Sequence, residues 1–217
     1  MMMNLFNIFD PSTLIFELKI NWLSSIFIIM LMPNFLWIFP NRIKILLIKM
    51  FKLLNNEILM LYKNKNIKSP SFMFLSLFMF IFFNNFISIF PYTFSSSSHM
   101  IFSMSLALPF WLFFILSSMF YNMKMMIAHL IPLNTPMFLT PLMVMIETMS
   151  ILVRPLSLSI RLTANLITGH LMMTLLNYNK MMFIILLIQM FMMMFEICIA
   201  FMQSYVFSIL CSLYSKE

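Results

Sequence analysis

Long apolar stretches dominate the 217-residue sequence, and polar positions gather in short segments between them. Residues 21–39 form an uncharged stretch long enough to cross a bilayer, which takes about 20 apolar residues in a helix. Two further spans, about 72–90 and 101–121, lie in a segment without Asp, Glu, Lys or Arg, and Pro91 with Ser95–Ser98 marks the turn between them. The pattern therefore predicts three upright membrane helices in the first part of the chain.

The segment between the first two of these spans is different, because it carries most of the charge. Residues 42–68 contain seven Lys or Arg and one acid, Glu57, so they hold +6 of the net charge of +7. Arg42, Lys49 and Lys52 recur at helical spacing among apolar residues, which predicts an amphipathic helix on a membrane surface. Nucleic-acid binding is the alternative, and the apolar opposite face disfavours it. Positive segments stay on the side of synthesis, which is the matrix for a mitochondrial product.

Two long apolar patterns follow a proline-containing connector, and each is too long to stand upright in a membrane. They run over residues 137–176 and 180–214. A helix of about 40 residues is about 60 Å long, twice the hydrocarbon thickness of about 30 Å. These helices must therefore be steeply tilted, kinked or partly outside the bilayer. Gly169, the only glycine, is a candidate position for a kink.

The composition agrees with this picture and excludes soluble classes. Hydrophobic residues make up 63% and charged residues 9%, against about 25% charged in soluble domains. We expect an all-α polytopic membrane protein with one upright span, an amphipathic matrix-surface helix, two further spans and two long tilted helices. Its single membrane domain, 1–217, divides into a span in 1–40, the basic helix in 41–69, two helices in 70–122, a connector in 123–136 and a helical hairpin in 137–217.

Each of the two long helices carries polar residues two turns apart on one face. Ionisable residues inside membrane segments are costly and usually functional, so this pattern favours a charge pathway over pairing that only holds the helices together. Ser and Thr along the first helix also fit helix packing. His170 lies on roughly the opposite side of the helix from Arg161. The repeated positions are Glu147, Arg154 and Arg161 on the first helix, and Gln189, Glu196 and Gln203 on the second.

The sequence gives no support for a phosphate-binding loop, a metal site or a disulfide. One glycine cannot make a phosphate-binding loop, and the three His and two Cys lack metal-ligand spacing, so we expect no cofactor and no metal. Cys198 and Cys211 would lie about 20 Å apart on one helix and cannot form a disulfide. No basic residue precedes Lys19, so the start lacks an import signal. Together with the preference for residues with AT-rich codons, this indicates synthesis inside a mitochondrion.

Several stretches resemble subunit a of F-type ATP synthase, in order along the whole chain. They are NLFNIFDPST (4–13), AHLIPLNTP (128–136), IET (146–148), VRPLSLSIRLTANLITGHLMM (153–173) and FEICIAFMQSYVFSILCSLY (195–214). The resemblance implies a proton-translocating stator subunit in the mitochondrial inner membrane, with the N-terminus towards the intermembrane space and the C-terminus towards the matrix. The implied partners are rotor-ring c subunits, other membrane-sector and peripheral-stalk subunits, and the lipid bilayer, with no nucleic acid.

The resemblance also implies roles for individual residues. Arg161 would face a rotor carboxylate and separate two half-channels, with Asn165 and Gln203 beside it. His170 and Glu196 would line the half-channel open to the intermembrane space. The remaining acid, Glu147, would lie near the half-channel open to the matrix.

Departures from the family pattern are few. They occur at Asn134, where the family often has Gly, and at Thr168, where it often has Ala, and position 154 varies between Arg and neutral residues. The sequence leaves open whether Arg154 has a functional role. Two other classes of protein remain as alternatives, namely an ion carrier that works alone, which would usually show inverted repeats, and a structural scaffold, which would not need Arg161 and His170.

Overall fold

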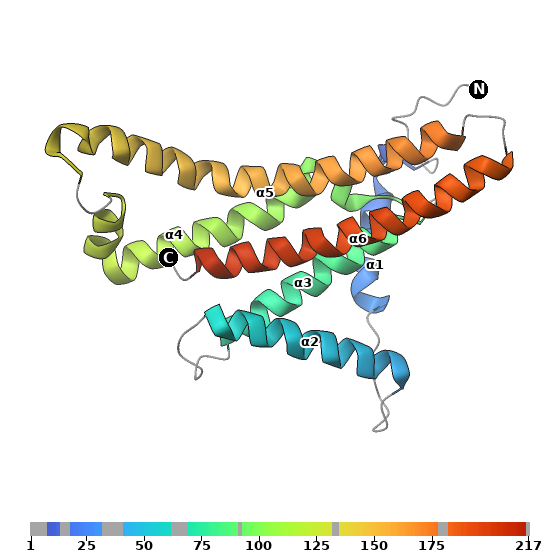
Figure 1. Ribbon diagram of the computed structural model, residues 1–217, viewed down its shortest axis with the longest axis horizontal. Helices are drawn as coiled ribbons and strands as arrows, with labels where there is room; N and C mark the ends of the chain where they lie inside the picture. Colours follow the sequence, from blue (N-terminus) through green and yellow to red (C-terminus); the bar gives the residue numbers. More distant parts are fainter. Residues whose placement is uncertain are drawn as a thin grey trace.

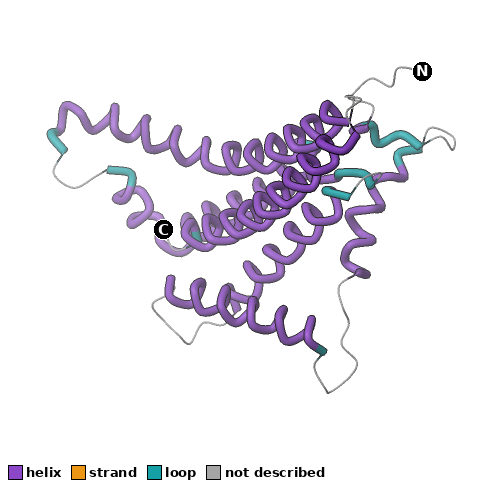
Figure 2. Tube along the Cα trace, turned by 45° about the vertical axis from the view of Figure 1, so that its right-hand side comes forward, coloured by secondary structure: helices purple, strands orange, loops and turns teal. Residues whose placement is uncertain are grey.

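The described part of the chain is built from helices without a strand, as Figures 1 and 2 show. This computed structural model describes residues 8–13, 18–31, 41–61, 69–90, 93–131, 135–177 and 182–215. The α-helices are α1 (Leu23–Leu31), α2 (Arg42–Leu61), α3 (Ser69–Ser88), α4 (Met100–His129), α5 (Thr140–Asn177) and α6 (Met182–Tyr214), and the short 3-10 helices are η2 (Ile20–Trp22), η3 (Ser96–Ser98) and η4 (Met137–Leu139).

Four helices in the described ranges are long and apolar enough to cross a membrane: Ser71–Ser88, Met100–Phe120, Met137–Leu176 and Ile184–Leu213. The expectation of an all-α polytopic membrane protein is thereby confirmed. For the predicted first span, 21–39, the structure describes α1 over Leu23–Leu31, and residues 32–40 lie outside the described residues, so that span stays a prediction.

The two longest helices, α5 and α6, run lengthwise beside each other, while α3 crosses them obliquely (Figure 1). α2 lies at the edge of the bundle, against α3 and α6. With 38 and 33 residues, α5 and α6 are about 57 and 50 Å long. α5 also bows along its length, and Pro155 lies inside it, where a proline removes one backbone hydrogen bond. Helices of this length exceed the hydrocarbon thickness, as the apolar patterns predicted.

The connector begins later than its predicted start at residue 123. α4 continues to His129, because the first helix-breaking residue after Pro109 is Pro132. The first long helix, α5, begins at Thr140 with Pro141 in its first turn, where a missing backbone N–H costs no intrahelical bond. Pro141 therefore marks the start of a helix and does not extend the connector.

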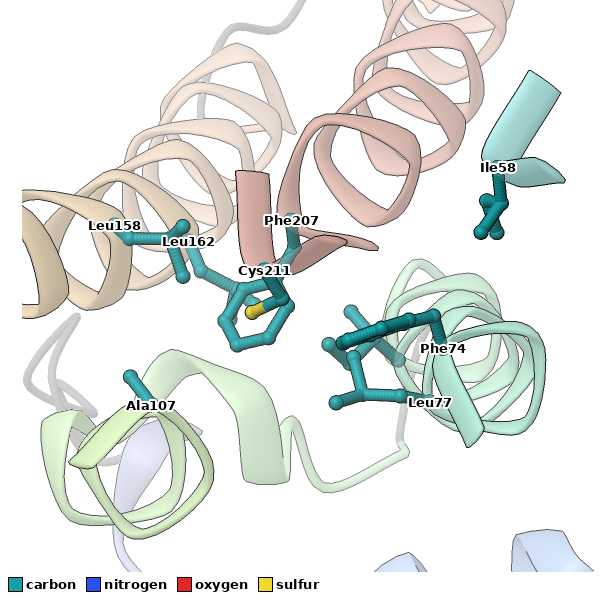
Figure 3. Packing of buried hydrophobic residues seen from close by; sticks show 9 residues of the cluster. Ile58, Phe74, Leu77, Ala107, Leu158, Leu162, Phe207 and Cys211 are labelled. Carbon is teal, nitrogen blue, oxygen red and sulfur yellow. The ribbon is translucent and has the colours of Figure 1, made fainter. Parts of the chain in front are cut away.

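Four helices meet in an apolar core near the middle of the molecule, and α2 adds a residue to it (Figure 3). Ala107 lets α4 approach closely, since its side chain is only a methyl group. Leu162 and Ile81 are fully buried there, at 0% exposure. The labelled members in Figure 3 are Ile58, Phe74, Leu77, Ala107, Leu158, Leu162, Phe207 and Cys211. This core fixes the position of α5 relative to α6, and thereby positions the polar residues described below.

The basic helix α2 buries one face against α3 and α6. Leu54 and Ile58 are buried, and Leu47 and Phe51 are partly buried against the same helices, so one side of α2 is apolar at spacings of four, three and four. The basic residues Arg42, Lys49 and Lys52 are exposed. α2 is thus amphipathic, with its charged side facing away from the membrane helices.

A hydrogen bond joins the polar edge of α2 to α6. The Tyr205 hydroxyl donates to the Glu57 carboxylate at 2.8 Å, on the exposed side of the contact. We expect Tyr205→Phe to loosen α2 without unfolding the bundle, because an exposed hydrogen bond contributes only about 1 kcal/mol. Limited proteolysis within residues 41–61 should become faster in this variant. A cleavage rate equal to that of the unaltered protein would show that apolar packing alone holds α2.

Candidate functional site

A cavity of about 220 Å³ lies between α5 and α6, and α3 closes one side of it. Most of its lining is apolar, but five polar side chains from three helices reach it. They are Asn85 from α3, Asn165 and Thr168 from α5, and Glu196 and Gln203 from α6. Because few polar groups converge in an apolar cavity, this is the default candidate for a functional site.

The carboxyl group of Glu196 lies directly against the backbone of α5 at Gly169. A Cβ atom at position 169 would come within 2.9 Å of Glu196 Oε1 and 3.0 Å of its Cδ. Only glycine leaves that space free, so the single glycine in the chain serves a close approach of an acidic side chain to the neighbouring helix. Glu196 Oε1 is buried and has no hydrogen-bond partner within the described ranges. The carboxyl is therefore placed between two helices with an unused oxygen.

His170 follows Gly169 on α5 and points to a different side of the helix. Its ring reaches the backbone of Ser88 at the end of α3, and the ring of Phe9 packs edge-on against it at 6.1 Å between centroids. Nε2 of the imidazole is buried without a hydrogen-bond partner in the described part of the chain. A second proton-binding group with unused capacity thus lies one residue along α5 from the contact with Glu196.

The amides of Asn165 and Gln203, which the resemblance placed beside Arg161, contact each other in the structure. Asn165 Nδ2 donates to Gln203 Oε1 at 3.2 Å, which connects α5 to α6 at the cavity. Gln203 is buried, with 6% exposure. Since Asn165 lies one helical turn from Arg161, the amide pair connects the cavity to the part of α5 that carries this arginine.

The side chain of Arg161 is exposed and leaves the bundle. Within the described residues it makes no ion pair and no hydrogen bond. A guanidinium always carries its charge and offers five donors, so it needs an acceptor. In an apolar, exposed surface that acceptor has to come from beyond the described residues or from water.

The other polar residues of α5 lie away from this site. The ion pair that the structure shows joins Arg154 to Glu147 at 3.4 Å within one helix, and does not join α5 to α6. Glu147 precedes Arg161 by 14 residues, which is about 21 Å along the helix axis. The structure therefore brings Glu196, His170, Asn165, Gln203 and Arg161 to one region and places Glu147 in another.

Sequence reasoning missed the contribution of α3 to the cavity. Asn84 and Asn85 are 1% exposed, and Asn85 Oδ1 is a further buried oxygen without a partner among the described residues. The available signal was two adjacent amides in a span that has no charged residue. Amides inside a membrane helix need polar partners, so this pair indicated a neighbouring polar site.

Fold and site together define an all-α multi-pass membrane protein with an ionisable site between its two longest helices. The sequence model of the family described as "ATP synthase A chain" matches residues 13–216. The chain belongs to this family. It is 70% identical over 214 residues to "ATP synthase F(0) complex subunit a" of Rhopalosiphum padi, with 99% of each chain covered.

More distant insect relatives match over the same length. "ATP synthase subunit a" of Aedes aegypti is 43% identical over 224 residues, and that of Drosophila melanogaster is 43% identical over 223, each with 100% of this chain and 99% of the relative covered. Family membership makes the chain a membrane-sector subunit of ATP synthase, which is a component of a proton-transporting complex and has no catalytic chemistry of its own.

Proposed function

We propose that this chain is the proton-translocating stator subunit of a mitochondrial ATP synthase. It works against a rotor ring of c subunits and forms two half-channels, so that proton flow turns the ring and drives ATP synthesis. Other membrane-sector and peripheral-stalk subunits hold it in the inner membrane. The resemblance of the whole chain to subunit a, and the family match over residues 13–216, support this proposal.

One observation carries the proposal, namely an exposed Arg161 without an ion pair among the described residues, on the helix that lines the cavity with Glu196. A structural scaffold needs neither a half-buried acid with a buried oxygen that has no partner in the described residues nor an arginine directed out of the bundle. A carboxylate on a passing rotor subunit would satisfy Arg161 by a charge-assisted hydrogen bond. The same carboxylate could take up a proton that reaches it from the cavity.

The proton path follows from the order of these groups. A proton from the intermembrane space passes His170 and Glu196 and neutralises the rotor carboxylate, which can then enter lipid without an uncompensated charge. After rotation, the carboxylate releases the proton into the matrix half-channel near Glu147. Arg161 favours the ionised carboxylate, and because it does not release its own proton, it blocks a direct leak between the half-channels. Each crossing supplies about 2.3 kcal/mol per 100 mV.

The orientation of the chain is part of the proposal. The basic face of α2 lies on the matrix side, by the rule that positive loops stay on the side of synthesis. The N-terminus then faces the intermembrane space and the C-terminus faces the matrix. In this orientation the α5–α6 turn lies on the side of the intermembrane space, and so do Gly169, His170 and Glu196, which are closer to this turn than Arg161 is along their helices.

We expect Gly169→Ala to slow proton transport while the complex still assembles. The new methyl group would overlap the carboxyl end of Glu196, a flexible side chain, so the carboxyl moves and the helices stay packed. Proton pumping by vesicles that contain the intact complex measures the effect. Ala128→Ser, which adds one atom at an exposed position of α4, is the control. Unchanged pumping in Gly169→Ala would show that the position of this carboxyl is unimportant.

A test of the partner uses the exposed face of α5. In a Cys198→Ser background, Ile160→Cys, at 42% exposure, should cross-link to a rotor-ring subunit in native membranes. Leu162→Cys, at 0% exposure, should not. Native electrophoresis with mass spectrometry identifies the product. If Ile160→Cys cross-links only to electron-transfer subunits, or the chain migrates alone, the carrier class of protein becomes the better explanation.

A further inference from the structure

A second group of buried polar side chains lies around the end of α3, outside the cavity already described. Ser88 and the four serines 95–98 are buried, with exposures of 0–4%. Ser97 Oγ and Ser24 Oγ have no hydrogen-bond partner in the described part of the chain. The 3-10 helix η3, which carries three of these serines, packs against α3, α4 and α5. Polar groups therefore continue beyond the cavity to the end of the bundle where η3 lies.

His99, at the start of α4, is the one titratable residue in this group. Its ring stacks on Phe94, with centroids 5.3 Å apart and 30° between planes, and it contacts Trp22 at 5.2 Å. Its Nε2 atom is buried and has no hydrogen-bond partner within the described residues. Two aromatic rings thus hold an imidazole in a fixed orientation with its inner nitrogen unused.

A hydrogen bond connects this group to α3, the helix that also contributes a side chain to the cavity. Ser96 Oγ donates to Asn84 Oδ1 at 3.3 Å, and the next residue, Asn85, lines the cavity that contains Glu196. On the same helix, one turn further on, Ser88 lies at the imidazole of His170. Polar side chains on α3 and η3 therefore bridge the region between His99 and the pair His170 and Glu196.

Unpartnered polar atoms in the hydrocarbon region are costly unless water reaches them. Six buried side-chain atoms of this kind occur in the described residues: Ser24 Oγ, Asn85 Oδ1, Ser97 Oγ, His99 Nε2, His170 Nε2 and Glu196 Oε1. Two of these atoms belong to η3 or to His99, which follows it. The other four belong to α1, α3, α5 and α6, which the structure packs together. Ordered water, which typically makes about three hydrogen bonds in such sites, would satisfy them together.

We propose that η3, the end of α3 and His99 form a hydrated extension of the uptake path, in which His99 transfers protons between outside water and the water that leads to Glu196. The imidazole accepts a proton from outer water, becomes imidazolium, and donates a proton from Nε2 to inner water. This inference rests on the proposed function. Among the described residues, the side chains that pack against the His99 ring are those of Trp22 and Phe94, which are uncharged. Lys19 precedes Trp22 by three residues at the start of η2. Inward along the proposed path, the titratable groups are His170 and Glu196.

The test compares pH profiles of proton flux in vesicles that contain the intact complex. We expect His99→Ala to lower the flux about tenfold, less than the loss of a direct acid–base group, because water still fills the path. In His99→Gln the packing around residue 99 should be kept, but the proton flux should still be lowered. Its dependence on the pH of the uptake side should also change. Added imidazole buffer should restore flux in His99→Ala, which a merely structural role of His99 would not permit.

Two serine variants provide a matched comparison. Ser97→Ala removes an unpartnered hydroxyl of the path, whereas Ser117→Ala removes a hydroxyl of α4 that bonds its own helix, at 2.9 Å to the Phe114 carbonyl. Only the first should slow proton flux.

Glu196→Gln, measured in the same vesicles, distinguishes a failure of the proposed extension from a failure of the proposed function. If the His99 variants keep the flux and pH profile of the unaltered complex while Glu196→Gln is slow, the extension is overturned and the proposed function stands. If Glu196→Gln is also normal, the proposed function itself fails.

Discussion

ATP synthesis driven by a proton gradient should be lost in Arg161→Ala, by a factor on the order of 100 or more, which is the effect of removing a preorganised charge partner. Arg161 is exposed and makes no ion pair or hydrogen bond in the described structure, so its loss removes no internal contact that holds the bundle together. The complex should therefore still assemble. Under the proposed function, loss of the fixed positive charge lets protons pass between the two proposed half-channels, and the gradient is dissipated as a leak.

Two arginine variants control this experiment. Arg154→Ala removes the other arginine of α5, which pairs with Glu147 on its own helix, and should retain most of the synthesis. Arg161→Lys keeps a positive charge but loses the planar fork of donors, so synthesis should be impaired while the leak stays small. Synthesis at the normal rate in Arg161→Ala, with the complex intact on a native gel, would exclude the proposed role.

Proton uptake should be slowed about 100-fold or more in Glu196→Gln, because the amide cannot exchange a proton and a positioned acid–base group typically contributes about 100-fold or more to the rate. The carboxyl lies at Gly169 with one oxygen unpartnered, so an amide of the same shape fits the site and assembly should be preserved. Acidification of vesicles during ATP hydrolysis measures the rate, and native electrophoresis measures assembly.

Glu57→Gln is the matched control for this substitution. It makes the same chemical change in α2, outside the cavity, and its amide oxygen can still accept the hydrogen bond from Tyr205. Proton uptake in Glu57→Gln should equal that of the unaltered complex. Equal rates in Glu196→Gln and Glu57→Gln would show that Glu196 has no part in proton transfer.

The sequence by itself determined the class of the protein and most of its elements, because apolar length and charge segregation are local properties. The uncharged stretch before Lys124 predicted α3 and α4, the basic spacing of residues 42–68 agrees with α2, and the overlong patterns correspond to α5 and α6. The motifs around Arg161 and Glu196 also led to the family that the comparisons show. Helix ends were less well predicted, as at α4, where nothing before Pro132 stops the helix.

Only the tertiary structure decided which polar groups meet. Helical periodicity places Glu147, Arg154 and Arg161 on one face, but it cannot show that Arg154 pairs within α5 while Arg161 has no ion pair among the described residues. It also gives no reason for a glycine at 169, since the reason is a carboxyl from another helix. Likewise, the part that α3 and η3 play depends on contacts between residues far apart in sequence. Such contacts arise from packing in three dimensions, which spacing along one helix does not encode.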